Sequence, residues 1–113
     1  MSVTIYHNPR CSKSRETLKL LQAQGIEPEI VEYLDTPPDE KELQAVLTML
    51  GIGPRELLRK KEAKEAGLDD PNLSDAQLIE GMIAHPKTIE RPIVIKDGKA
   101  ALGRPPERVL EIL

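Results

Sequence analysis

The sequence contains one cysteine, Cys11, in a setting that would make a thiol reactive. Cys11 follows the turn-forming pair Asn8-Pro9 and directly precedes a stretch with helical periodicity. The start of a helix presents unpaired N–H groups and a partial positive charge, and both favour thiolate over thiol. Because the thiolate is the nucleophilic form of cysteine, we predict that Cys11 is a nucleophile. The alternative is that Cys11 is a small apolar filler at a strand–helix junction.

Polar and cationic residues on both sides of the cysteine argue against that alternative. Arg10, Lys13 and Arg15 place positive charge close to the sulfur in sequence, and the hydroxyl of Ser14 lies where it could donate to it. A helix start with free N–H groups is also an oxyanion site. His7 is either a residue that tunes the thiolate or an idle turn residue.

Three further arginines, Arg59, Arg91 and Arg104, lie where the chain is expected to turn. The guanidinium group offers a planar fork of donors that suits a tetrahedral oxyanion. Spacing alone favours solvated surface charge for each of them. Arg55 and Arg108 are likewise interpreted as solvated surface charges.

Composition limits the class of protein. A chain of 113 residues fits one domain, and 31% charged with 39% hydrophobic residues is typical of a soluble globular protein. A net charge of −3, without Trp or Phe, argues against nucleic-acid binding. A single Cys with two His cannot form an internal disulfide or a closed zinc site. No membrane span or leader pattern is evident, so we expect a cytoplasmic protein.

The elements that must position these residues follow from periodicity and turn signals. Strands are predicted at 3–6, 30–34, 92–95 and 100–102, with an Asp97-Gly98 hairpin turn between the last two. Helices are predicted at about 12–24, at 36–50 with Thr36 as cap, at 54–59, at 74–84 and near the C-terminus, while 60–73 is expected to be a loop. The order predicts an α/β protein with a thioredoxin-like, four-stranded mixed sheet and a helical insertion, at 52–85, between strands two and three.

The residues resemble a known family, the glutaredoxin-coupled arsenate reductases, over nearly the whole chain. The matching segments are IYHNPRCSKSR at 5–15, LLRKK at 57–61, HP at 85–86, ERPIV at 90–94 and GRPPE at 103–107. The resemblance implies a thioredoxin-like fold with Pro92 as a cis proline beside the active thiol. The segment around Cys11 is more cationic here, the stretch after Lys61 is shorter, and the C-terminal tail of some members is missing.

The resemblance also implies roles for individual residues. Cys11 would be the nucleophile, and Arg59, Arg91 and Arg104 would be catalytic residues that hold the oxyanion. His7 and Ser14 would stabilise the thiolate. Arsenate would be the substrate, glutathione the co-substrate and glutaredoxin the protein partner, with no bound cofactor and no metal.

Two other functions share these features. A glutathione-dependent reductase of other disulfides would use the same Cys11. An Spx-type regulator shares the fold and binds RNA polymerase without catalysis, but many such regulators carry a two-cysteine switch that this chain lacks.

Overall fold

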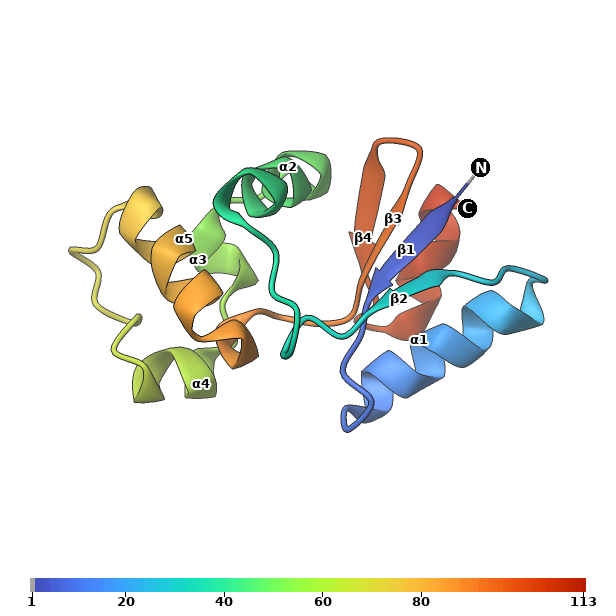
Figure 1. Ribbon diagram of the computed structural model, residues 1–113, viewed down its shortest axis with the longest axis horizontal. Coiled ribbons are helices and arrows are strands. Elements are labelled where there is room, and N and C mark those ends of the chain that lie inside the picture. Colours follow the sequence, from blue (N-terminus) through green and yellow to red (C-terminus); the bar gives the residue numbers. More distant parts are fainter. Residues whose placement is uncertain (1) are drawn as a thin grey trace. The chain divides into compact units, whose positions relative to one another are not determined.

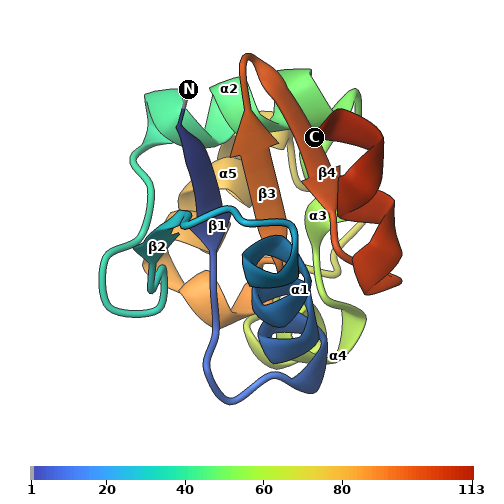
Figure 2. The same ribbon diagram turned by 90° about the vertical axis from the view of Figure 1, so that its right-hand side faces the viewer.

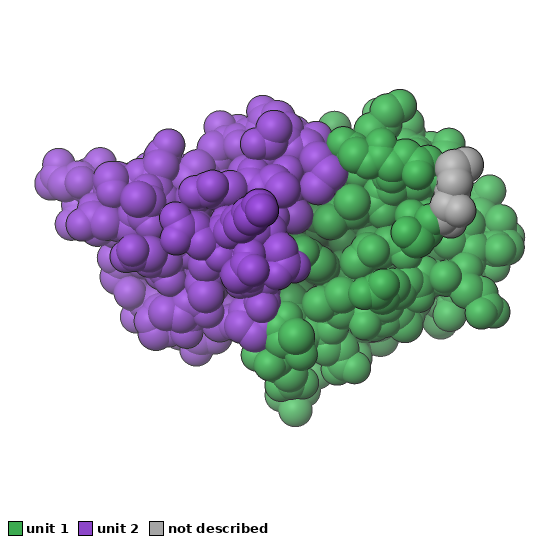
Figure 3. All heavy atoms as spheres, turned by 45° about the horizontal axis from the view of Figure 1, so that its top comes forward, with its two compact units in different colours: residues 1–36, 91–113 green, residues 37–90 purple. Residues whose placement is uncertain are grey.

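The computed structural model describes residues 2–113 and divides the chain into two compact units. The first contains residues 1–36 and 91–113, and the second contains residues 37–90 (Figure 3). The second unit is longer than the insertion predicted at 52–85, because the helix that follows strand two belongs to it. The expectation of a single domain stays a prediction, and each unit is described by itself.

The first unit is built on a four-stranded mixed sheet in the order β2-β1-β3-β4. β1 pairs with β2 in parallel and with β3 antiparallel, and β3 pairs antiparallel with β4. This confirms the predicted sheet. The elements of the unit are β1 (Val3–Tyr6), α1 (Ser12–Ala23), β2 (Glu29–Val31), β3 (Ile93–Lys96), β4 (Lys99–Leu102) and the 3₁₀ helix η2 (Pro106–Ile112) (Figure 1).

One face of this sheet is covered by α1 and η2, which Figure 2 shows in front of the strands. The buried core of the unit is a cluster of aliphatic side chains from the sheet, α1 and η2: Val3, Ile5, Leu21, Val94 and Val109. Val3 and Ile5 are two residues apart on β1 and therefore point to the same face. Burial of these side chains fixes α1, and with it the residues at its N-terminus, against the sheet.

The ends of three strands meet at one edge of the sheet. The register pairs Tyr6, the last residue of β1, with Ile93, the first of β3. Ile93 in turn pairs with Leu102, the last residue of β4. The loops that leave β1 and β4, and the loop that enters β3, therefore start from neighbouring positions.

Two local predictions in the first unit need adjustment. β2 ends at Val31, not Leu34, because the chain turns at 32–35. The C-terminal helix is of the 3₁₀ type. The predicted hairpin is confirmed, since Asp97 (φ 51°) and Gly98 (φ 77°) both have the positive φ that a type I′ turn requires.

The second unit is helical. It contains α2 (Glu40–Leu50), α3 (Pro54–Leu57), α4 (Lys60–Glu65), α5 (Asp75–Ala84) and the 3₁₀ turn η1 (Pro86–Thr88). The prediction of a loop over 60–73 is wrong for 60–65, where Ala63 is buried against Leu68 and Leu78 and tertiary packing stabilises a short helix. Among residues 2–113, no helix is both long and apolar enough to cross a bilayer.

The cap of α2 also differs from the prediction. Asp39, not Thr36, is the N-cap: its carboxylate accepts a hydrogen bond from the Glu42 N–H at 2.7 Å. Glu42 reaches back to the Asp39 N–H and completes the capping box. The TPPD segment offers a Ser/Thr-x-x-Asp spacing, but two consecutive prolines delay helix formation past Asp39.

This cap gives a first prediction. Asp39→Ala should lower the free energy of unfolding by about 1 kcal/mol, because the Glu42 N–H at the helix start loses its acceptor. Thr36→Ala, at an exposed position outside the helix, should change it by less than about 0.5 kcal/mol. Denaturant titration followed by circular dichroism would measure both, and equal losses would contradict the assignment of the cap.

Candidate active site

Cys11 is the N-cap residue of α1, with extended backbone (φ −94°, ψ 123°). Its N–H donates to the Asn8 carbonyl at 3.0 Å, which closes the turn after β1. Its carbonyl accepts the first helical hydrogen bond, from the Arg15 N–H at 3.0 Å. The main-chain N–H groups of Ser14 and Lys13 lie near the sulfur and lower its pKa, although the Cys11 side chain makes no capping hydrogen bond. The sulfur therefore occupies the position that a capping oxygen takes in other helices.

Two arginines bring positive charge to the same sulfur. The Arg91 side chain hydrogen-bonds Cys11, and Arg104 Nη2 lies 3.8 Å from Cys11 Sγ. Arg91 is 9% exposed and Arg104 is partly buried. The three loops at the sheet edge thus bring together residues 11, 91 and 104.

The balance of these contacts lowers the pKa of the Cys11 thiol below its ordinary value. Burial raises the pKa, but the nearby Ser14 N–H, the hydrogen bond from the Arg91 side chain, the nearby Lys13 N–H and the Arg91 charge together outweigh it. Cys11 remains partly exposed. A stabilised and accessible thiolate is a nucleophile, and the surrounding donors suit an anion that reacts with it.

The two arginine loops hold each other in place. Arg104 Nε donates to the Arg91 carbonyl at 2.8 Å, and the Gly103 N–H donates to the Pro92 carbonyl at 2.9 Å. Both the Arg91-Pro92 and the Arg104-Pro105 peptide bonds are cis. The first was expected from the family resemblance, and the second was not foreseen.

Gly103 occupies a space that no side chain can share. A Cβ atom at this position would lie 2.5 Å from Thr17 Oγ1 and 2.7 Å from Pro92 Cγ. Thr17 is fully buried on α1 and its hydroxyl donates to the Lys13 carbonyl at 2.8 Å, so it has little freedom to move. Glycine therefore lets the Arg104 loop pack directly on the cysteine helix.

His7 and Ser14 form a second, buried network behind the cysteine turn. Ser14 Oγ lies 2.6 Å from His7 Nδ1 and accepts a hydrogen bond from the Asn8 N–H at 3.0 Å. The Ser14 hydroxyl, expected to donate to the sulfur, is engaged with His7 and Asn8 instead, and it is the Ser14 main-chain N–H that lowers the pKa of Cys11. Burial lowers the pKa of His7; nearby Glu32 raises it and Arg15 lowers it, and the net shift is downward.

Arg59 lies in the second unit, as the N-cap of α4 and not at the end of a helix as predicted. Its guanidinium group pairs with Glu90 at 2.9 Å and with Glu62 at 3.4 Å. Burial lowers the pKa of Arg59, but the two carboxylates raise it more, so the net shift is upward. Its predicted role toward a substrate stays a prediction.

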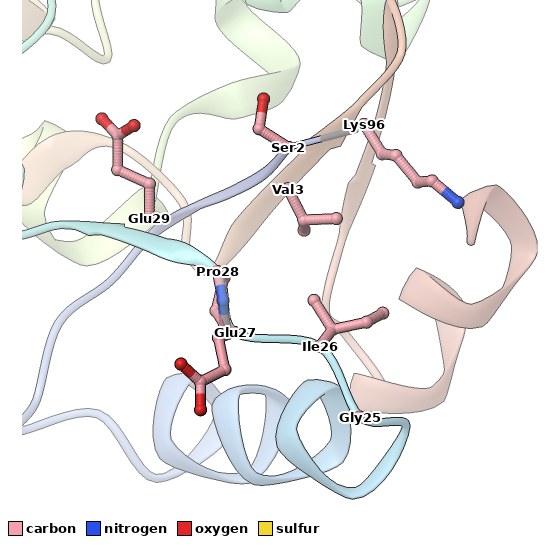
Figure 4. A pocket seen from close by; sticks show the side chains of 8 residues that line it. All are labelled: Ser2, Val3, Gly25, Ile26, Glu27, Pro28, Glu29 and Lys96. Atoms are coloured by element: carbon pink, nitrogen blue, oxygen red, sulfur yellow. The ribbon is translucent and has the colours of Figure 1, made fainter.

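Hollows also occur in the surface of the first unit. One, of about 250 Å³, lies beside the cysteine turn and is lined by residues 7–10 with Glu32, Leu34 and Asp35; we call it the turn pocket. Another, of about 510 Å³, lies where β1 begins and α1 ends. Figure 4 shows that its charged side chains, Glu27, Glu29 and Lys96, point in different directions, so they form no convergent site. Among residues 2–113, no group of three or more His, Cys, Asp or Glu could hold a metal ion.

The chain matches a known protein family over nearly its whole length. Residues 6–112 match the sequence profile of the ArsC family. The chain belongs to the ArsC family. An ArsC relative, the arsenate reductase of Haemophilus influenzae, is 52% identical and aligned over the whole of both chains. The uncharacterized protein YfgD of Escherichia coli K12 is 57% identical over 98% of this chain and 96% of its own length.

The fold of this chain matches that of a solved relative over its whole length. The arsenate reductase from Vibrio cholerae is 55% identical and superposes with a TM-score of 0.96, covering 100% of this chain and 98% of that one. The ArsC chain described here therefore has the thioredoxin-like fold that its sequence predicted.

Sequence reasoning missed several residues that build this ArsC site. Asn8 was read only as a turn residue, yet its carbonyl, its N–H and its side chain all hold the cysteine turn; the side-chain oxygen accepts from the Arg10 N–H at 3.0 Å. Glu90 binds Arg59 and Gly103 packs on α1. In the sequence, Glu90 directly precedes Arg91 and Gly103 directly precedes Arg104. These positions indicate the segment that builds the site, but they do not predict which residue each one contacts.

The Cys11 environment gives a second prediction. Because the pKa of Cys11 is lowered, thiolate persists to lower pH, and the rate of iodoacetamide alkylation should stay high below the pH at which glutathione loses reactivity. Arg91→Gln should raise the pKa of Cys11 by removing a hydrogen bond and a positive charge. Arg108→Gln, at an exposed site that faces Glu111, should leave the profile unchanged. A wild-type profile equal to that of glutathione would contradict this description of the site.

A third prediction concerns Gly103. Gly103→Ala should destabilise the protein by about 1–3 kcal/mol, as overpacking does, and should displace Arg104 from Cys11. Gly53→Ala is the control, since its Cβ would meet only the Glu56 Oε1 atom, at 3.9 Å. Thermal unfolding and alkylation rate would be measured together. Unchanged stability and reactivity in the Gly103 variant would show that the loop does not depend on this contact.

Proposed function

We propose that the chain reduces arsenate to arsenite, with Cys11 forming a covalent bond to arsenic. The observation that carries the proposal is the sulfur at the start of α1, stabilised by main-chain N–H groups and approached by Arg91 and Arg104. Relatives of about 50% identity from Haemophilus influenzae and Neisseria meningitidis are named arsenate reductases. Both the geometry and these names support an oxyanion substrate.

The first step is substitution at arsenic. The Cys11 thiolate forms a sulfur–arsenic bond while one arsenic–oxygen bond breaks, and the departing oxygen takes up protons to leave as water. Arsenic remains As(V) at this stage. Arg91 and Arg104 offset charge on the remaining oxygens, and the N–H groups at the helix start bind an oxygen as they bind the free thiolate. Arg59 is assigned to the substrate by the family resemblance.

Reduction requires two electrons, which one cysteine cannot supply by forming an internal disulfide. A glutathione thiol replaces a second oxygen on arsenic, and water leaves again. A glutaredoxin thiolate then attacks the glutathione sulfur, and the electron pair of the sulfur–arsenic bond moves to arsenic. The products are As(III) and a glutathione–glutaredoxin disulfide. Water finally displaces arsenite from Cys11 and restores the thiolate.

The supporting residues have indirect roles in this scheme. His7 and Ser14 hold the turn from which the Ser14 N–H reaches the sulfur. No step requires a metal or an organic cofactor. A free catalytic thiol and a glutathione supply both belong to a reducing compartment, so we place the reaction in the cytoplasm.

A coupled assay with arsenate, glutathione, glutaredoxin and NADPH-dependent glutathione reductase tests the proposal. Cys11→Ser should abolish turnover while far-UV circular dichroism is unchanged, because a hydroxyl is not ionised at neutral pH. Arg91→Gln should reduce kcat/KM for arsenate by about 100-fold, the loss typical of a donor to a developing charge, and Arg108→Gln should not.

A small disulfide offered in place of arsenate distinguishes the main alternative. Turnover of the disulfide with none of arsenate would identify a thiol–disulfide reductase. Retained arsenate turnover by Cys11→Ser would exclude Cys11 as the nucleophile.

A further inference from the structure

The turn pocket contains both signs of charge without internal pairing. Arg10 contributes positive charge, and Glu32 and Asp35 contribute negative charge, to the lining of a hollow of about 250 Å³. No ion pair joins these three side chains to each other or to any other residue among 2–113, although all three are exposed. Leu34, 38% exposed, adds an apolar side chain to the lining. The pocket is therefore polar: Glu32 acts electrostatically on His7, and within the described residues none of the three charged side chains is held in an ion pair.

His7 adds a buried donor to this pocket. It is 6% exposed and lines the hollow, and its Nδ1 atom is bonded to Ser14. Ser14 Oγ is fully buried and accepts the Asn8 N–H, so its own proton has one place to go within the described residues, His7 Nδ1. A buried hydroxyl seldom leaves its proton without an acceptor. The imidazole, kept neutral by its lowered pKa, then carries its proton on Nε2.

The second ring nitrogen has no partner in the part of the chain that the structure describes. Because His7 lines the turn pocket and its Nδ1 atom is engaged with Ser14, the Nε2–H group is the part of the ring left to donate to a ligand there. Together the pocket presents two donors for a carboxylate, His7 and Arg10, and two acceptors for an ammonium group, Glu32 and Asp35. A carboxylate and an ammonium on one carbon are the head group of an α-amino acid.

We propose that the turn pocket binds the γ-glutamyl head group of glutathione and so delivers the glutathione thiol to Cys11. This inference rests on the proposed function, which requires an external thiol. The pocket is smaller than the 300–1,000 Å³ of sites that enclose whole small molecules, so it suits one amino-acid end of the tripeptide. Its wall at Arg10 is adjacent in sequence to Cys11, and an extended tripeptide spans roughly 10 Å. The glutathione cysteine then extends toward the Cys11 side of the turn.

The test uses thiol–disulfide exchange, which needs no arsenate. The Cys11 thiolate attacks oxidised glutathione, forming a Cys11–glutathione disulfide and releasing one glutathione thiolate. The same reaction is run with the disulfide of cysteinylglycine, which lacks the γ-glutamyl residue. The ratio of the two rate constants measures recognition of the γ-glutamyl group independently of the reactivity of Cys11.

The variant Glu32→Gln with Asp35→Asn should lower this ratio by about tenfold, because lost hydrogen bonds to a charged group have an effect of this order. The charge-matched control is Glu27→Gln with Glu29→Gln, two exposed positions on the other hollow, and its ratio should be unchanged. Removing negative charge should by itself speed the approach of anionic oxidised glutathione. General electrostatics therefore predicts that the ratio rises in the acidic-pair variant, whereas specific binding of the γ-glutamyl group predicts that it falls.

Several outcomes would overturn the inference. An unchanged ratio, an increased one, or an equal fall in the control variant would each show that the pocket does not recognise the γ-glutamyl group. A raised KM for glutaredoxin with an unchanged ratio would assign the pocket to the protein partner and also overturn it. Failure of the proposed function has a separate signature: no arsenate turnover in the wild type, with the ratio still falling in the acidic-pair variant.

Discussion

A negative charge on Cys11 Sγ is offset by groups from three separate loops of the first unit. The helix start supplies N–H groups of Lys13 and Ser14, while Arg91 and Arg104 approach from the loops around β3 and β4. Burial is the largest single contribution to the pKa of Cys11, so the lowered pKa requires several donors together. The site therefore depends on all three loops being held at the same edge of the sheet.

The sheet register satisfies that requirement. Tyr6, Ile93 and Leu102 are neighbours across β1, β3 and β4, so the loops that carry Cys11, Arg91 and Gly103-Arg104 start side by side. Hydrogen bonds between the two arginine loops, and the close approach of Gly103 to α1, then fix the conformation of the loops that carry Arg91 and Arg104. The pairing of the strands thus determines where the charged side chains of Arg91 and Arg104 lie relative to Cys11.

Much of this could be predicted from the sequence, for physical reasons. The first strand with its β-branched residues, Gly51 at a helix end and the Asp97-Gly98 turn are local signals, and each was confirmed. The helix at 60–65 was missed because it is stabilised by burial of Ala63, a tertiary contact that a charged segment does not reveal. The position of Cys11 at a helix start could be predicted from the turn before it and the helical periodicity after it, and its role as nucleophile stays a prediction. The partners of Ser14 and Arg59 could not be predicted, since they depend on residues distant in sequence.

The lone sulfur of this chain has a further consequence for oxidative stress. A stabilised, accessible thiolate is the form that peroxides oxidise first, to a sulfenic acid. Proteins with a second nearby thiol protect that state as an internal disulfide, but these 113 residues contain no such partner. Rescue must come from a diffusible thiol before irreversible sulfinic acid forms. The supply of small thiols therefore determines both turnover of the site and its survival.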